Sequence, residues 1–191
     1  MTETRETAQE TARAAPAGRV IGIAGWSGSG KTTLVTRLVP LLVARGLTVS
    51  TLKHAHHSFD VDTPGKDSYE HRRAGASQVL VASMNRWALM HELRGAPEPS
   101  LESLLAKFDP VDLVLIEGFK REGHEKLEVH RPGLGKPPLW PEDPSVVAVA
   151  SDAALPDCPL PVLPLDRVEA IADFLVAHCG LRREEAPAWP S

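Results

Sequence analysis

The chain has 191 residues, of which 42% are hydrophobic and 24% are charged, and this length and composition favour one soluble domain with a real core. Its formal net charge of -4 disfavours nucleic acid as a partner, and its longest apolar run, residues 38–44, is far shorter than the roughly 20 residues of a membrane-spanning helix. Two cysteines without a C-x-x-C pair favour reduced thiols and a cytoplasmic location over a disulfide scaffold.

The amino-terminal half predicts a βαβ unit. Residues 1–18 lack an apolar segment, and we expect them to be a disordered tail. Residues 19–25 (RVIGIAG) predict a buried strand, residues 31–45 an amphipathic helix bent by Pro40, and residues 47–54 (LTVSTLKH) a second strand. Strand, helix and strand within forty residues predict parallel strands with a helix packed on the sheet.

The middle of the chain predicts smaller elements. Residues 66–76 indicate a short helix closed by Gly75, and residues 100–108 indicate another. Between them, residues 78–83 and 86–93 predict a β-hairpin turning at Met84 and Asn85. We expect this hairpin to add an antiparallel edge to the sheet.

The carboxyl-terminal half predicts three more strands and a final helix. The strands are residues 112–118, 126–132 and 146–152, and the helix is residues 166–180 with Asp166 as its N-cap. Residues 131–144 are rich in proline and predict a loop. The whole predicts an α/β, P-loop NTPase-like domain over residues 19–180. It has a mostly parallel sheet with helices on both faces, an added hairpin, and a flexible tail at residues 181–191.

Residues 25–32 (GWSGSGKT) fit the phosphate-binding pattern G-x-x-x-x-G-K-[ST], between a predicted strand and a predicted helix. Glycines let backbone N–H groups approach phosphate oxygens, and the helix N-terminus adds partial positive charge. Lys31 is predicted to reach the β- and γ-phosphates, Thr32 to place its hydroxyl on Mg²⁺, and Thr33 to touch the α-phosphate. The expected nucleotide contacts in this loop are Gly25, Ser27, Gly28, Ser29, Gly30, Lys31, Thr32 and Thr33.

Glu117 ends the apolar run of residues 112–118, where P-loop proteins place the acidic partner of the magnesium site. We expect it to bind Mg²⁺ with Thr32, directly or through water, or to orient an attacking water beside Lys31. The alternative is a structural glutamate that caps the next turn.

Residues 53–68 (KHAHHSFDVDTPGKDS) follow the second predicted strand and hold three histidines and three aspartates. Their start belongs at the carboxyl edge of the sheet, where open α/β sheets bind ligands. A loop that senses the γ-phosphate and Mg²⁺ is the favoured interpretation, with Asp60 near the metal. A zinc site and a merely solvated loop are the alternatives.

Asp152 follows the predicted strand 146–152 and is the candidate for reading the nucleotide base. A carboxylate can accept two hydrogen bonds from guanine, whereas adenine offers no such donor pair and would leave the carboxylate unpaired. The alternative is an ordinary turn residue.

Several motifs in order resemble one family. They are AGWSGSGKTTL, LKHAHHSFDVDTPGKDSYEHRRAGA, VLVASMNRWALM, LVLIEGFK, VVAVASD and LDRVEAIADFL, between residues 19 and 177. Together they resemble the MobB family, the molybdopterin-guanine dinucleotide biosynthesis adaptor proteins. Residues 131–144 match the family's pattern poorly, so the resemblance implies no role for them.

The resemblance implies a GTP-binding homodimer with weak GTPase activity. Such a protein would assist a MobA-type guanylyltransferase that joins GMP to molybdopterin, and the resemblance also implies molybdopterin as a partner molecule. The resemblance also favours guanine over adenine at Asp152, and it implies nucleotide contacts at Gly28, Gly30, Lys31, Thr32 and Thr33.

Two other classes of function compete with this interpretation. In a small-molecule kinase, Asp60 would be the general base for a substrate hydroxyl. A nucleic-acid motor would need a basic track, which the scattered lysines and arginines do not form.

Overall fold

The computed structural model describes residues 18–55 and 59–181, which form two compact units. The main unit comprises the described residues up to His54 and from Glu102 onward, and the hairpin unit comprises those between Ala55 and Leu101. The tails were expected at residues 1–18 and 181–191. Residues 1–17 and 182–191 of these tails, and residues 56–58 of the histidine stretch, lie outside the described residues.

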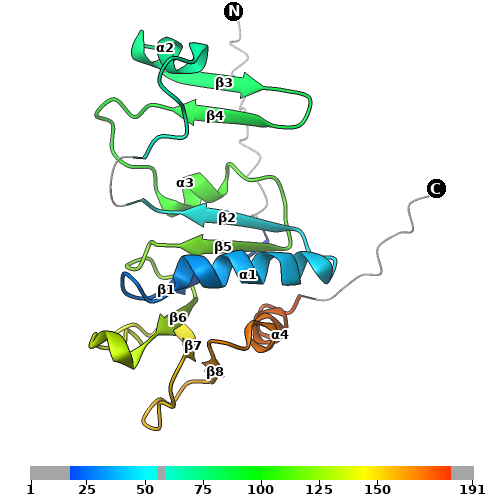
Figure 1. The fold of residues 1–191 in the computed structure, drawn as a ribbon, viewed down its shortest axis with the longest axis vertical. Helices are drawn as coiled ribbons and strands as arrows, with labels where there is room; N and C mark the ends of the chain where they lie inside the picture. The colour runs from blue at the N-terminus through cyan, green and yellow to red at the C-terminus, as the bar shows by residue number, and fades with distance from the viewer. Residues whose placement is uncertain (1–17, 56–58, 182–191) are drawn as a thin grey trace, which may run out of the picture. The chain divides into compact units, whose positions relative to one another are not determined.

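The main unit is built on a six-stranded parallel sheet with the order β2-β5-β1-β6-β7-β8 (Figure 1). Strand β1 therefore lies in the interior of the sheet, between β5 and β6. The strands are β1 Arg19–Ala24, β2 Val49–Lys53, β5 Leu113–Glu117, β6 Lys126–His130, β7 Val146–Ser151 and β8 Val162–Pro164. The prediction of a P-loop-like, mostly parallel sheet with helices is confirmed.

Helices α1 (Lys31–Ala44) and α4 (Val168–His178) pack against each other and against one face of this sheet. Leu34, Leu38 and Leu42 recur every four residues on α1, and they meet alternate side chains of the strands, such as Ile21 and Ile23. Each of these side chains is almost fully buried, which stabilises the fold by about 1.5–3 kcal/mol apiece. The remaining helices are α3 (Leu101–Leu105) and a single 3₁₀ turn, η1 (Pro132–Leu134).

One detail of the helices differs from the sequence expectations. Helix α4 begins one residue later than expected, with Arg167 as its N-cap and no side-chain capping bond, so Asp166 is not the cap. Pro40 lies within α1 on its exposed side, where water can bind the carbonyl that lacks an N–H partner.

The other face of strand β6 carries buried polar side chains. Lys126, Glu128 and His130 alternate along the strand, and none exposes more than 6% of its surface. The carboxylate of Glu128 accepts the backbone N–H groups of Leu139 and Trp140 at 2.8 and 3.0 Å. These bonds hold the proline-rich loop 131–145 over the sheet, and burial raises the pKa of Glu128.

The hairpin unit contains α2 (Asp67–Arg73) and the antiparallel pair β3 (Gln78–Ala82) and β4 (Trp87–His91). The expected hairpin is confirmed, and its turn lies between Ser83 and Arg86, whose backbone atoms are bonded at 2.8 Å. The expectation that it extends the main sheet is wrong, because β3 and β4 pair only with each other in a separate two-stranded sheet.

Candidate functional site

The phosphate-binding loop follows β1 and leads directly into α1, at the carboxyl edge of the main sheet. Glycine is required at both ends of the loop for different reasons. A Cβ on Gly25 would lie 2.5 Å from the carbonyl oxygen of Val129, and its φ is +140°. Gly30 is the N-cap of α1 with φ 98° and ψ 17°, a left-handed conformation that L side chains rarely adopt.

The residues between these glycines form the loop itself. Ser27 and Gly28 are exposed at its tip, whereas Ser29 is 1% exposed. Thr33 is exposed in the first turn of α1. All the loop residues expected to contact a nucleotide therefore lie together at the helix N-terminus, where backbone N–H groups favour an anion.

Lys31 is the first residue of α1, and its ammonium donates a hydrogen bond to the carbonyl oxygen of Trp26 at 2.9 Å. Burial lowers the pKa of Lys31, and the positive charge of Lys120 lowers it further, while Glu117 opposes both. Lys31 and Lys120 thus bring two positive charges to the loop, which suits a polyanionic ligand.

Thr32 and Glu117 lie together as expected, although they are 85 residues apart in the chain. The Thr32 hydroxyl donates to Glu117 Oε1 at 2.7 Å, and the Lys53 ammonium lies 3.8 Å from the same oxygen. The Glu117 carboxylate is only 15% exposed. A hydroxyl and one carboxylate fit Mg²⁺, which takes one or two carboxylates and completes its shell with water and phosphate oxygens.

Asp152 follows β7 and lines a cavity of about 610 Å³ at the same edge of the sheet. The walls of this cavity are Ser151, Asp152, Ala153, Ala154, Leu155, Pro156, Val162, Leu163, Pro164 and Asp166. Small and apolar side chains, together with the carboxylates of Asp152 and Asp166, are suited to a flat heterocycle with N–H donors.

Arg131 links the phosphate loop to Asp152. Its Nε donates to the Ser29 carbonyl at 2.9 Å, and its Nη1 lies 2.8 Å from Asp152 Oδ2. Sequence reasoning gave this residue no role. The sequence nevertheless contained a signal for Arg131. Residues that directly follow a parallel strand lie at the carboxyl edge of the sheet, where ligands bind, and Arg131 follows β6 just as Asp152 follows β7.

Trp26 connects the phosphate loop to the loop after β6. Its indole N–H donates to the Pro137 carbonyl at 2.7 Å, and the ammonium groups of Lys120 and Lys136 lie 4.9 and 5.9 Å from its ring centre. In the structure it packs against residues 120 and 136–137 by a hydrogen bond and cation–π contacts.

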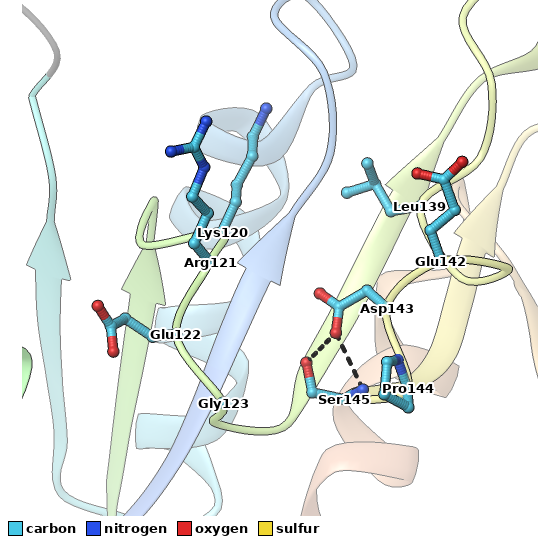
Figure 2. Close-up of a pocket in the computed structure, with 9 residues that line it drawn as sticks. All are labelled: Lys120, Arg121, Glu122, Gly123, Leu139, Glu142, Asp143, Pro144 and Ser145. Atoms are coloured by element: carbon cyan, nitrogen blue, oxygen red, sulfur yellow. Dashed lines mark hydrogen bonds between the residues drawn. The ribbon is translucent and has the colours of Figure 1, made fainter.

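A second cavity, of about 660 Å³, opens between residues 120–123 and residues 139–145. Figure 2 shows Lys120 and Arg121 together on one side and Leu139, Glu142 and Asp143 on the other. Asp143 is already engaged, because its carboxylate accepts hydrogen bonds from Ser145 (Figure 2) and lies 3.2 Å from the buried Lys126 ammonium.

Asp60, the third expected metal ligand, belongs to the hairpin unit. Both of its carboxylate oxygens accept hydrogen bonds from Arg72 Nη2, at 2.9 and 2.7 Å, and this contact lowers the pKa of Asp60. Arg72 also lies 3.3 Å from Glu92. The role of Asp60 in metal binding stays a prediction. Within residues 18–55 and 59–181, no three His, Cys, Asp or Glu side chains form a metal-binding group.

None of the helices in the described part of the chain is long and apolar enough to span a membrane.

Comparison with known proteins shows one consistent similarity. Residues 20–152 match the family model described as molybdopterin guanine dinucleotide synthesis protein B, MobB. The chain is 47% identical over 160 residues to the molybdopterin-guanine dinucleotide biosynthesis adapter protein of Escherichia coli K12, covering 82% of this chain and 91% of that protein. It is 46% identical over 160 residues to the adapter protein of Haemophilus influenzae, covering 82% of this chain and 86% of that one.

Solved structures agree with the sequence matches. A crystal structure of molybdopterin-guanine biosynthesis protein B superposes with a TM-score of 0.68 at 29% identity, covering 84% of this chain and 99% of that one. The MobB homologue of Bacillus stearothermophilus superposes with a TM-score of 0.64 at 25% identity, covering 85% and 99% of the two chains. By its sequence and its fold, this protein therefore belongs to the MobB family.

Proposed function

We propose that this protein is a cytoplasmic GTP-binding adapter in molybdopterin-guanine dinucleotide biosynthesis. It binds GTP with Mg²⁺, hydrolyses it weakly, and assists a MobA-type guanylyltransferase that attaches GMP to molybdopterin. The adapter role is supported by the relatives, which carry that name and match nearly their whole length. The observation that carries the nucleotide site is the phosphate loop itself, with Lys31 at its helix start and Thr32 bonded to Glu117.

The site residues then have distinct roles. Backbone N–H groups of residues 25–33 bind the phosphates, and Lys31 exchanges its bond to the Trp26 carbonyl for β- and γ-phosphate oxygens. Thr32 and Glu117 hold Mg²⁺, which neutralises phosphate charge when bound. Glu117 is also placed to orient a water molecule. Turnover by the protein alone should be slow, on the order of 10⁻⁴ to 10⁻² s⁻¹, as for unassisted GTPases.

The kinase alternative requires Asp60 as a general base. Arg72 instead engages both oxygens of that carboxylate, at 2.9 and 2.7 Å, so a substrate hydroxyl would have to compete with this ion pair. Adapter function is therefore better supported than phosphoryl transfer to a small molecule.

Asp152 is proposed to select guanine, and the matching prediction concerns Asp152→Asn. We expect this change to lower the affinity for GTP by about tenfold to a hundredfold, because each hydrogen bond to a charged group contributes roughly 1.5–3 kcal/mol. The affinity for ATP should fall less. Calorimetric titration with each nucleotide in the presence of Mg²⁺ measures the two affinities and gives the ratio of the affinity for GTP to the affinity for ATP.

Asp109→Asn is the control, because Asp109 is an exposed aspartate before β5 and does not line this cavity. It should leave the GTP to ATP ratio unchanged. Equal losses for the two nucleotides in Asp152→Asn would make Asp152 a structural residue, and wild-type protein that binds ATP as tightly as GTP would contradict guanine selection altogether.

Homodimer formation is proposed to use the hairpin unit. Leu80 and Leu89 are directly opposed on β3 and β4 and are 61% and 47% exposed, and Trp87 is 66% exposed. An isolated two-stranded hairpin is only marginally stable in water, so an apolar surface of this kind gains stability when covered.

We expect Leu80→Asp combined with Leu89→Asp to shift the protein from dimer to monomer, because each change places a charge on the proposed interface. Light scattering coupled to size-exclusion chromatography measures the mass. Val43→Asp, which changes a 53% exposed valine on α1, is the matched control and should leave the mass unaltered. A wild-type mass of one chain at every concentration would exclude the dimer.

A further inference from the structure

Arg131 contacts the Ser29 carbonyl and the Asp152 carboxylate from a backbone position that neighbouring structure restrains. It directly follows β6, whose residues Glu128 and His130 are buried, and its own carbonyl accepts the N–H of Leu134 at 3.0 Å. Glu128 also anchors the loop that follows. The backbone of Arg131 is therefore held between the paired strand β6 and the turn closed by Leu134, which limits where its guanidinium can reach.

The contact with Ser29 controls the direction of an amide in the phosphate loop. In a trans peptide the carbonyl of one residue and the N–H of the next point in opposite directions. Arg131 Nε donates to the Ser29 carbonyl, so the N–H of Gly30, which belongs to the same peptide unit, points away from Arg131. Inward-turned N–H groups are what a phosphate-binding loop offers to its ligand.

The guanidinium also packs on Gly30. A Cβ built on Gly30 would lie 3.5 Å from Arg131 Nη2 and 3.7 Å from Nε. The guanidinium therefore lies beside Gly30, the N-cap of α1.

The contact between Arg131 and Asp152 sets the orientation of the carboxylate at the cavity proposed for the base. Nη1 binds Oδ2 of the carboxylate, which leaves Oδ1 for another donor. The planar guanidinium presents its donors at fixed angles, so the position of the Ser29 carbonyl and the orientation of the Asp152 carboxylate are set by one rigid group. The Arg131 and Asp152 side chains are 40% and 41% exposed, so both are accessible to a ligand.

We propose that Arg131 is a positioning residue that couples the phosphate loop to the carboxylate at the base cavity, so that phosphate binding and base selection depend on one side chain. This inference rests on the proposed function. It adds to that function a residue in a loop where the family resemblance implied no role.

The first test needs no nucleotide. Hydrogen–deuterium exchange followed by mass spectrometry should show faster exchange of peptides covering residues 25–33 in Arg131→Ala than in wild type, by about tenfold if Arg131 holds the loop closed by one charge-assisted hydrogen bond. Asp152→Asn should accelerate the same peptides, because it releases the guanidinium. Unchanged exchange in a folded Arg131→Ala protein would overturn the proposal.

The second test is nucleotide binding. Arg131→Ala should lower the affinity for GTP by about tenfold to a hundredfold and should also lower the GTP to ATP ratio. A residue that only stabilised the fold would not change that ratio. Arg131→Lys should not restore either property, because one ammonium cannot hold both acceptors in a fixed geometry.

A double-mutant cycle separates coupling from two independent effects. If Arg131 couples the phosphate loop to Asp152, the two substitutions should not have independent effects. The protein with both Arg131→Ala and Asp152→Asn should then bind GTP with an affinity within about threefold of the single variant that binds GTP more weakly. Losses that multiply would show that Arg131 and Asp152 act separately and would overturn the coupling.

Arg45→Ala is the matched control. Arg45 also bonds one carboxylate and one carbonyl, with Asp173 at 2.6 Å and the Glu169 carbonyl at 3.4 Å, but it does so between α1 and α4. It should change neither loop exchange nor nucleotide binding. If wild-type protein binds no nucleotide while the exchange results hold, the proposed function fails and the connection between the loop and Asp152 stands.

Discussion

Replacing Lys31 by alanine is expected to lower the affinity for GTP by at least about a hundredfold while leaving the protein folded. The ammonium is the first side chain of α1, and the only hydrogen bond recorded for it among the described residues joins it to the Trp26 carbonyl at the loop surface. Its loss therefore removes a charge-assisted contact with phosphate, at roughly 1.5–3 kcal/mol for each bond, without opening the core. Calorimetric titration with GTP and Mg²⁺ measures the affinity, and circular dichroism confirms the fold.

Lys107→Ala is the control for this experiment, because Lys107 is an exposed lysine just after α3 and outside the loop. It should bind GTP like wild type. A folded Lys31→Ala protein with unaltered affinity would show that residues 25–33 do not bind the nucleotide phosphates, and the proposed function would have to be abandoned.

Replacing Lys126 by alanine is expected to lower the free energy of unfolding by about 2–4 kcal/mol. The Lys126 side chain is 1% exposed, and its ammonium binds the Glu122 carbonyl at 2.6 Å, the Ser145 hydroxyl, and the Asp143 carboxylate at 3.2 Å. Alanine would leave these acceptors unpaired and a cavity behind. Asp143 is 26% exposed, so water recovers part of the loss.

Thermal unfolding measures this effect, and the melting temperature should fall by roughly 5–15 °C. Lys126→Met should lose less, because it fills the space of the aliphatic chain. Lys107→Ala, on the surface, should change stability by less than about 0.5 kcal/mol. An unaltered melting temperature for Lys126→Ala would mean that the buried ammonium contributes nothing to holding residues 143–145.

The order of elements was predictable because hydrophobic periodicity is local information. Strands 19–25, 112–118 and 146–152 and the helices after residues 31 and 166 were all expected, and all are present within a few residues. Strand β8 was missed, because three residues ending in proline carry no recognisable period. The N-cap of α4 was misplaced by one residue, since an aspartate near a helix start satisfies the sequence rule whether or not its side chain reaches a backbone N–H.

Strand β6 shows where local patterns are insufficient. Its alternation of charged and apolar residues is typical of a strand with one face in water. The structure buries Lys126, Glu128 and His130 beneath the loop 131–145, and hydrogen bonds compensate for the burial of Lys126 and Glu128. The residues of β6 alone do not predict that a loop later in the chain will cover this face of the strand.

The amino-acid sequence alone identified the glycine-rich loop at residues 25–32 and the acidic residue at the end of β5, because both depend on residue types at fixed short spacings. It also determined the family, through six motifs in order. Tertiary structure alone decided which distant side chains meet: Glu117 with Thr32, and Arg131 with both Ser29 and Asp152. The physical reason is that strand order brings these residues to one edge of the sheet, and strand order depends on packing across the whole domain.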